Sequence, residues 1–378
     1  MDELVRDLAP QVLGVLVRRG ADFAAAEDAV QEALVEAVRR WPDAPPDDPK
    51  PWLITVAWRK FLDATRSDTA RRTREERLHE EPAPGPAEDQ DDTLELLFLC
   101  CHPSLTPTSA VALTLRAVGG LTTGQIAEAY LVPETTMGQR ISRAKRTVAT
   151  AGVGAPGDLG RVLKVLYLIF NEGYSGDVDL AAEAIRLTRM LSHASPEPEV
   201  GGLLALMLLH HARRAARWGA DGALVPLADQ DRSAWDTTLV AEGVEILQAA
   251  LAQDRLGEYQ CQAAIAALHC DARSAAETDW TQVLEWYDEL LALTDSPVVA
   301  LNRAVAVGEA DGPLAGLREL TKVPADVPRR TAVNAWLHER AGDLTTAATL
   351  YAEAAGLATN AAERDHLTRQ AARLRHPG

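Results

Sequence analysis

Apolar residues recur every three or four positions along much of the chain, which is the spacing of a helix with one buried face. The first run has its apolar residues at Leu4, Leu8, Val12, Val15 and Leu16. A second run begins at Phe23 and continues to Trp41, where Pro42 ends it because proline disfavours a helical conformation in the preceding residue. These patterns predict two amphipathic helices at the start of the chain.

The stretch 121–147 has the most informative pattern. A short helix can begin there at Thr122 or Thr123, whose hydroxyl groups can cap it, and its apolar face is formed by Ile126, Ala127 and Tyr130. Pro133 then interrupts the helical spacing. A second helix follows from Glu134, and its buried stripe consists of Met137, Ile141, Ala144 and Val148. The pattern predicts a helix-turn-helix. Gly138 lies inside the second helix, where it indicates a locally loose or a closely packed segment.

The rest of the second helix is basic. Its polar surface includes Gln139, Arg140, Arg143, Lys145 and Arg146. Such a helix can lie in the major groove of DNA. The alternative is a surface helical hairpin with a solvated basic face. The concentration of positive charge within an acidic chain favours DNA binding.

Composition narrows the class of protein. The chain has 378 residues, a net charge of −17, 47% hydrophobic residues and only 5% aromatic residues. This composition, rich in Ala and Leu, predicts an all-α protein of two or three domains. No apolar run is long enough to span a membrane and no signal sequence is recognisable, so we expect a cytoplasmic protein. The four cysteines form no disulfide framework, and the net acidity argues against indiscriminate binding to nucleic acids.

A further basic helix is predicted after the proline-rich loop 42–51. Trp52, Val56 and Trp58 have core-like spacing within it. Basic residues follow at Arg59, Lys60, Arg66, Arg71 and Arg72. Aromatic rings beside arginines suit single-stranded DNA, because bases stack on the rings while guanidinium groups hold phosphates. The alternative for Trp52 and Trp58 is a purely structural place in the core.

Residues 79–93 form an acidic segment without apolar periodicity, which predicts a flexible linker. Cys100, Cys101 and His102 lack the spacing of a metal site, so we expect the two cysteines to end a buried helix and expect no metal. A buried helix is also predicted over 203–211.

Two segments near the end of the chain repeat one pattern. Residues 297–317 and 332–350 each predict a helix, a turn containing Gly or Asp, and a second helix. The spacing of Ala335, Gly342, Ala347, Tyr351 and Ala355 is that of tetratricopeptide (TPR) repeats. Stacked helix pairs of this kind form a concave surface for a peptide or protein. An irregular helical bundle is the alternative.

The polar run 229–236, DQDRSAWD, offers the side chains of a ligand or metal site. No nucleophile-and-base pair and no phosphate-binding loop accompanies it. A polar turn packed between helices explains the run with fewer assumptions. We therefore predict no catalytic residue, no cofactor and no enzymatic activity.

Two stretches, AEDAVQEAL at 26–34 and PKPWLITVAWRKFLDATR at 49–66, carry recognisable motifs. Through them the chain resembles the bacterial extracytoplasmic-function (ECF) sigma factors, whose second region has such an acidic helix followed by such a second helix. Trp58 and Arg59 replace the usual Arg-Asn pair of that second helix. The sequence Leu105-Thr106-Pro107 and the helix-turn-helix resemble the fourth sigma region. The full layout is similar to the ECF subgroup with a long C-terminal TPR-like extension.

The resemblance implies four segments: sigma region 2 over 1–78, the linker over 79–93, sigma region 4 over 94–153, and a regulatory extension over 154–378. It implies core RNA polymerase, through its β′ clamp helices and β flap, and promoter DNA as partners. Asp28, Gln31 and Glu32 would contact the polymerase. The −10 element would be bound by Trp58, Arg59, Lys60, Arg66, Arg71 and Arg72. The −35 element would be bound by Thr136, Gln139, Arg140, Arg143, Lys145 and Arg146.

Two other functions remain open at this point. One is a stand-alone helix-turn-helix regulator with a helical domain that senses a ligand or peptide. Such a protein would bind duplex DNA tightly without polymerase. The other is a helical scaffold without a DNA role, which would leave Arg140 and Arg143 unexplained.

Overall fold

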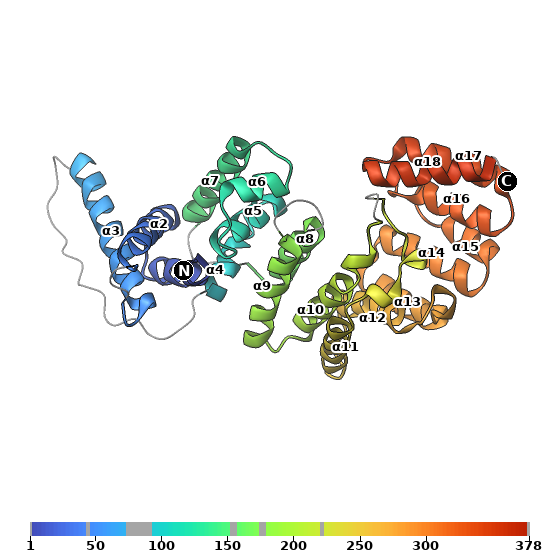
Figure 1. Cartoon of the computed structure of the whole chain (residues 1–378), viewed down its shortest axis with the longest axis horizontal. Coiled ribbons are helices and arrows are strands. Elements are labelled where there is room, and N and C mark those ends of the chain that lie inside the picture. The colour runs from blue at the N-terminus through green and yellow to red at the C-terminus, as the bar shows by residue number, and fades with distance from the viewer. Residues whose placement is uncertain are drawn as a thin grey trace. The chain divides into compact units, whose positions relative to one another are not determined.

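The computed structural model describes residues 2–42, 46–72, 93–151, 157–173, 179–219 and 223–375. Within these ranges the chain consists of α-helices and short 3-10 helices, with a single isolated bridge between Trp218 and Leu224 (Figure 1). This confirms the predicted all-α class. The chain divides into two compact units, Met1–Leu191 and Ser192–Gly378. None of the described helices is both long enough and apolar enough to span a bilayer.

The first unit begins with three helices, α1 (Asp2–Arg18), α2 (Phe23–Arg40) and α3 (Pro49–Arg72). Asp22 caps α2 by accepting hydrogen bonds from the backbone N–H groups of Ala24 and Ala25. The helices α1 and α2 have the predicted positions. In contrast, α3 begins inside the predicted loop, because Pro49 and Pro51 lie in the first turn, where a helix needs no N–H donor.

The buried face of α3 differs from the predicted one. Leu53, Ile54 and Ala57 are almost fully buried, whereas Trp52 and Val56 are half-buried. The Trp52 ring packs edge-on against Trp41, with 5.6 Å between ring centroids. The Trp52 ring therefore lies at the margin of this three-helix core beside Trp41, while Leu53, Ile54 and Ala57 fill its centre.

Four further helices form the second part of this unit: α4 (Thr93–Cys100), α5 (Pro107–Ala117), α6 (Thr123–Ala129) and α7 (Glu134–Ala151). Helix α5 begins at Pro107, where the resemblance of Leu105-Thr106-Pro107 to the fourth sigma region places a helix start, and the Thr106 side chain caps it. The prediction that the adjacent cysteines end a buried helix is also confirmed, since Cys100 is the last residue of α4 and both thiols are buried. The predicted linker 79–93 falls outside the described residues except for Thr93.

The helices α8 (Leu159–Glu172) and α9 (Leu180–Ala194) continue the first unit as far as Leu191. Helix α8 packs against α4 and α5. The Arg161 guanidinium donates hydrogen bonds to the carbonyl oxygens of Cys101, His102 and Leu105 at 3.2, 3.4 and 2.9 Å. The predicted start of the extension, residue 154, thus precedes two helices of the first compact unit.

The second unit starts with α10 (Pro198–His211), α11 (Thr237–Leu251) and α12 (Glu258–Asp271), which pack on one another. Residues 203–209 are fully buried, as predicted, while His210 and His211 are half-buried. Between α10 and α11 lie the 3-10 helices η1 (Arg214–Ala216), η2 (Leu227–Asp229) and η3 (Arg232–Ala234), and η4 (Ala275–Glu277) follows α12.

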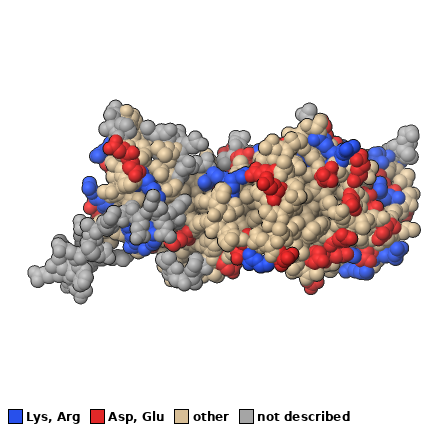
Figure 2. All heavy atoms as spheres, turned by 90° about the horizontal axis from the view of Figure 1, so that it is seen from below, with Lys and Arg blue, Asp and Glu red and all other residues tan. Residues whose placement is uncertain are grey.

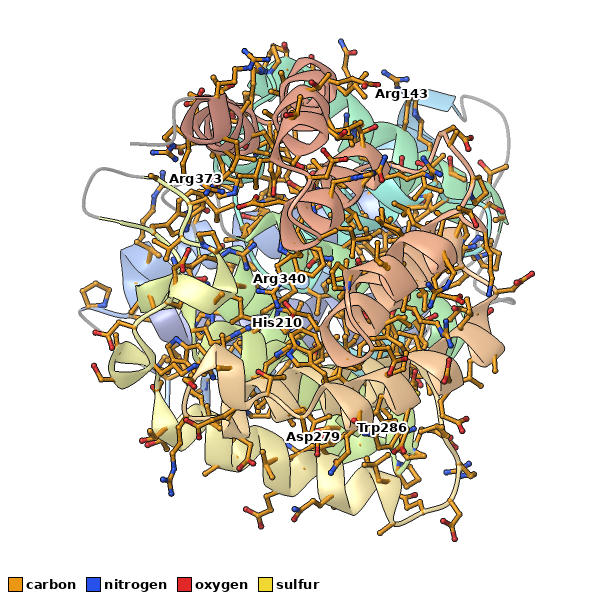
Figure 3. The ribbon with its side chains drawn as sticks, turned by 90° about the vertical axis from the view of Figure 1, so that its right-hand side faces the viewer. Arg143, His210, Asp279, Trp286, Arg340 and Arg373 are labelled. Carbon is orange, nitrogen blue, oxygen red and sulfur yellow. The ribbon has the colours of Figure 1, made fainter. Side chains whose placement is uncertain are left out.

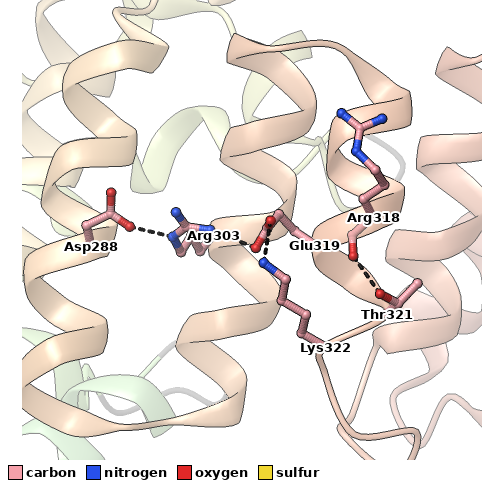
Figure 4. Close-up of polar contacts among 6 residues, drawn as sticks. All are labelled: Asp288, Arg303, Arg318, Glu319, Thr321 and Lys322. Atoms are coloured by element: carbon pink, nitrogen blue, oxygen red, sulfur yellow. Dashed lines mark hydrogen bonds and ion pairs between the residues drawn. The ribbon is translucent and has the colours of Figure 1, made fainter.

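The chain ends in α13 (Trp280–Thr294), α14 (Pro297–Ala310), α15 (Pro313–Leu320), α16 (Arg330–Arg340), α17 (Leu344–Leu357) and α18 (Ala361–Arg375). The two predicted helix-turn-helix units are α14–α15 and α16–α17. Their turns contain Gly312 and Gly342 at φ of 94° and 84°, a left-handed conformation that favours glycine. Ion pairs link neighbouring helices: Arg303 of α14 contacts Asp288 of α13 and Glu319 of α15 (Figure 4).

Candidate polymerase and promoter interface

The three predicted polymerase contacts lie on one polar face of α2. Asp28, Gln31 and Glu32 are all exposed, because their spacing of three and four residues places them on the same side of the helix. The opposite face is held in the core by Ala26, Ala29, Val30 and Ala33. The core therefore fixes the orientation of a solvent-facing acidic surface.

Glu27, next to this face, has a different environment. The residue is only 4% exposed, and its carboxylate forms an ion pair with Arg116 of α5, with 2.9 Å between Arg116 Nε and Glu27 Oε1. The Lys145 ammonium of α7 contacts Oε2 of the same carboxylate. One buried carboxylate thus joins α2 to two helices of the following segment. The acidic motif contains Glu27, but the sequence prediction did not assign it a function.

The predicted −10 residues lie along α3. Trp58 is half-buried, with its ring centroid 5.4 Å from that of Phe61 and the Arg19 guanidinium 5.7 Å away. Arg59 is exposed. Lys60 lies against α2, where its Nζ is 3.5 Å from a Glu32 oxygen and 3.3 Å from a Glu36 oxygen. The side chains of Arg66, Arg71 and Arg72 lie outside the described part of the chain.

The helix-turn-helix has the predicted geometry. Thr122 and Gln125 form a reciprocal capping box at the start of α6, in which each side chain accepts a hydrogen bond from the other residue's backbone N–H. The buried residues of α7 are those that the sequence predicts: Met137, Ile141, Ala144 and Val148. The turn contains Leu131, which is 85% exposed at a φ of 51°.

The predicted −35 residues divide into two groups. Thr136, Gln139, Arg143 and Arg146 are exposed on the face of α7 opposite the buried stripe. The Arg143 side chain is labelled in Figure 3. Arg143 and Arg146 also border a shallow depression lined by Ser104 and Thr150. Arg140 is half-buried, and Lys145 points towards Glu27. The structure therefore presents a basic helix face of the kind that binds phosphate and base edges.

The sequence Cys100-Cys101-His102 is enclosed by α5 and α8. Burial raises the pKa of the Cys100 thiol well above its usual value, and it raises that of Cys101 to about 12. Both thiols are therefore protonated and weakly nucleophilic at neutral pH. In the described ranges, no three His, Cys, Asp or Glu side chains are grouped so as to hold a metal ion. The segment has a structural role, because the carbonyl oxygens of Cys101 and His102 accept hydrogen bonds from Arg161.

The polar run 229–236 is likewise structural. Arg232 donates hydrogen bonds to the carbonyl oxygens of His269 and Ala272 at 2.5 and 2.7 Å, and so caps the end of α12. The Trp235 ring is buried, with the guanidinium groups of Arg213 and Arg232 at 5.8 and 4.6 Å. The run is thus a polar turn packed between helices. Elsewhere in this unit, Figure 2 shows acidic and basic side chains interspersed on the visible face.

Three protein-family models match successive parts of the chain. The model of sigma-70 region 2 matches residues 4–71, and that of sigma-70 region 4 matches residues 95–148. The chain therefore carries the two regions of an ECF sigma factor, regions 2 and 4, followed by a C-terminal extension. A family of unknown function, DUF6596, matches residues 158–251 and so forms part of the extension of this sigma factor. Sigma factors direct transcription initiation by RNA polymerase and are not enzymes. This confirms the prediction that the protein has no enzymatic activity.

Two relatives show how far this similarity extends. The sigma factor is 40% identical over 395 residues to the uncharacterized protein R00370 of Rhizobium meliloti (strain 1021), covering 96% of this chain and 92% of that protein. It is 29% identical over 188 residues to the probable ECF RNA polymerase sigma factor SigI of Mycobacterium tuberculosis, covering 47% of this chain and 62% of SigI. No solved structure matches.

Proposed function

We propose that the sigma factor binds core polymerase through Asp28, Gln31 and Glu32, which would face the β′ clamp helices, while region 4 lies at the β flap. The −10 strand would contact α3 at Trp58 and Arg59 and at the basic residues beyond them. The −35 duplex would contact α7. The exposed polar face of α7, opposite its buried stripe, is the observation that supports this assignment most strongly.

Run-off transcription with sigma-free core polymerase tests this proposal. The full chain should yield specific transcripts from promoters of its own genome. Arg143→Ala should lower −35 duplex affinity about tenfold if Arg143 contacts a base edge or phosphate. Arg318→Ala removes the same charge from an exposed position of α15 and is the matched control. Equal affinities of the two variants would contradict the assignment of α7.

The polymerase contact is tested separately with Asp28→Asn. This variant should bind core polymerase less tightly, because an exposed carboxylate that pairs with a basic partner contributes to association. Glu353→Gln, an exposed carboxylate of α17, makes the same change in net charge and is the control. If core polymerase does not bind the chain while duplex DNA does, a stand-alone regulator would explain the protein better.

We also propose that the extension is TPR-like and regulates the sigma regions by binding a peptide or protein. Ala335, Ala347, Tyr351 and Ala355 pack in one buried cluster between α16, α17 and α18, which is the role that the predicted repeat assigns to them. The pairs Arg340–Glu309 and Arg373–Glu339 join alternate helices of the array, α16 to α14 and α18 to α16. Arrays of this kind have a concave face suited to an extended partner.

A further inference from the structure

A carboxylate of the extension is buried beside region 4 of the sigma factor. Glu183 lies in the first turn of α9, within the part of the chain that matches DUF6596, and only 6% of the residue is exposed. Its two oxygens accept hydrogen bonds from the Arg186 guanidinium at 2.7 and 3.1 Å. The Arg186 side chain is 46% exposed, so this cation lies at the surface while the carboxylate faces the protein interior.

The carboxylate reaches the turn that leads into the helix-turn-helix. A Cβ atom on Gly119 would lie 3.2 Å from Glu183 Oε1 and 2.8 Å from the carbonyl oxygen of Leu115. The next residue, Gly120, has a φ of 67°, a left-handed conformation that favours glycine. Two consecutive glycines therefore let the chain turn tightly after α5 and leave room for a carboxylate from outside region 4.

The turn is connected to the helices on either side of it. The Leu121 N–H donates to the carbonyl oxygen of Leu115 at 3.1 Å, and the Arg116 guanidinium donates to that of Leu121 at 3.0 Å. Thr122, which caps α6, follows directly. A displacement of this turn is therefore passed on to α6, and through the packing of α6 on α7 to the basic helix α7.

The last turn of α8 lies near the other end of α6. There the chain approaches the start of α9 so closely that a Cβ on Gly173 would overlap the backbone nitrogen of Ala181. Burial raises the pKa of Tyr130, the C-cap residue of α6, and Glu172 raises it further, while Arg140 of α7 lowers it. Such electrostatic effects require proximity. Residues of the extension therefore lie near both ends of α6.

Recognition of bases tolerates little displacement of α7. A hydrogen bond between a side chain and a base edge requires a donor–acceptor distance of about 2.7–3.2 Å. A shift of roughly 1 Å in α7 would break such bonds, whereas phosphate contacts, which depend on charge over a longer range, would weaken less. The orientation of α6 and α7 relative to α5 thus matters more for sequence discrimination than for general DNA affinity.

We propose that Glu183 is a positioning residue for recognition of the −35 element. Its carboxylate holds the turn 118–122 from outside region 4 and so sets the orientation of the helix-turn-helix, without touching DNA itself. The proposal rests on the function proposed above. It assigns part of the −35 recognition to the extension, whose first two helices then belong to the promoter-binding machinery and not only to its regulation.

Promoter discrimination by the holoenzyme, formed from core polymerase and the full chain, tests this role. The affinity is measured for a promoter of the chain's own genome and for the same duplex with its −35 bases scrambled. Glu183→Ala should lower the ratio of the two affinities about tenfold, a typical coupling between sites, with little change for the scrambled duplex. A variant that is merely partly unfolded would lower both affinities in proportion, so an unchanged ratio would overturn the proposal.

Two further variants separate the contact at Gly119 from a general loss of structure. Glu199→Ala removes a half-buried carboxylate that accepts hydrogen bonds from the N–H groups of Tyr259 and Gln260 in the second unit. This matched control should leave the ratio unchanged. Glu183→Gln retains the length and one oxygen of the side chain, so it should keep most of the discrimination. Equal losses in Glu183→Ala and in either of these variants would overturn the assignment.

Hydrogen exchange in the free full chain tests the contact without polymerase or DNA. Glu183→Ala should speed exchange in residues 118–125 about tenfold, because the hydrogen bonds of a released turn open more often. Exchange in α4 should not change, and unchanged exchange in 118–125 would overturn the proposal. If Glu183→Ala does not fold, Glu183→Asp makes the same test, since it keeps the charge but withdraws the carboxylate from Gly119 by one methylene.

The two measurements separate this proposal from the proposed function. If no holoenzyme forms, the proposed polymerase contact fails, while hydrogen exchange still decides whether Glu183 holds the turn. If the holoenzyme forms and Glu183→Ala does not change its discrimination, the positioning role is wrong and the sigma assignment stands. Faster exchange in 118–125 together with lost discrimination supports both.

Discussion

At the scale of single residues, Gly138 in α7 offers a direct test of helix stability. A Cβ added there would lie 3.8 Å from the Thr123 Cγ2 atom, an ordinary van der Waals contact, so the close packing considered from the sequence is absent. Gly138→Ala should therefore stabilise the helix by about 0.5–1 kcal/mol through lower backbone entropy in the unfolded chain. Thermal melting should show a higher midpoint; a lower one would reveal strain at this position.

Two histidines of the second unit give a pH-dependent stability. Burial and the guanidinium groups of Arg213 and Arg217 lower the pKa of His210 to about 3. Burial, Arg213 and Arg232 lower that of His269 to about 4. Both imidazoles therefore stay neutral in the folded unit at pH values where the unfolded chain, with a pKa of about 6.5, binds a proton. Unfolding takes up protons, so stability falls as the pH drops through about 6.5 towards 4.

The loss should reach at most about 1.4 kcal/mol per pH unit for each histidine. This loss of stability is measured by urea unfolding of the full chain between pH 7 and pH 4.5, with hydrogen exchange in residues 192–375 as the readout. His210→Gln should flatten the pH dependence, since it removes one proton-binding group from the unfolded chain. His193→Gln changes an exposed position and is the control, so it should leave the pH dependence of stability unchanged. Identical slopes in both variants would contradict the assignment to His210.

At the scale of elements, Arg161 anchors α8 to the end of α4. Its guanidinium donates hydrogen bonds to the carbonyl oxygens of Cys101, His102 and Leu105, so Arg161→Ala should destabilise the first unit by about 2–3 kcal/mol. Lys164→Ala, on an exposed position of the same helix, is the control and should change stability by less than about 0.5 kcal/mol. Denaturant unfolding measures the change in unfolding free energy for each variant. Equal effects of the two substitutions would show that α8 is not anchored in this way.

The sequence predicts elements whose signals are local. The stripe Met137, Ile141, Ala144 and Val148 repeats at helical spacing, and the structure buries all four residues. The cap at Thr122 also depends on neighbouring residues only. Local patterns could not assign Arg161 or Glu27. The partners of Arg161 lie 56–60 residues away in the sequence, and those of Glu27 lie in α5 and α7. Such pairings depend on tertiary packing, which periodicity does not record.

At the scale of the whole molecule, the division between the units determines how the chain should be truncated. A chain of residues 1–153, the predicted sigma segments, lacks α8, whose buried face consists of Val162, Leu163, Val165, Leu166, Ile169 and Phe170. It would expose the surfaces of α4 and α5 on which α8 packs. Residues 1–191 retain this contact.

We therefore expect residues 1–191 to unfold cooperatively with little binding of a hydrophobic dye, and 1–153 to bind the dye and melt at lower temperature. Equal melting of both chains would show that α8 contributes nothing to region 4. The comparison decides how the regulatory role of the extension can be measured. If 1–153 is destabilised, lost transcription by that chain reports damage to region 4, because the truncation removes part of its core. Only the difference between 1–191 and the full chain then gives the sign of the effect that residues 192–378 have on initiation.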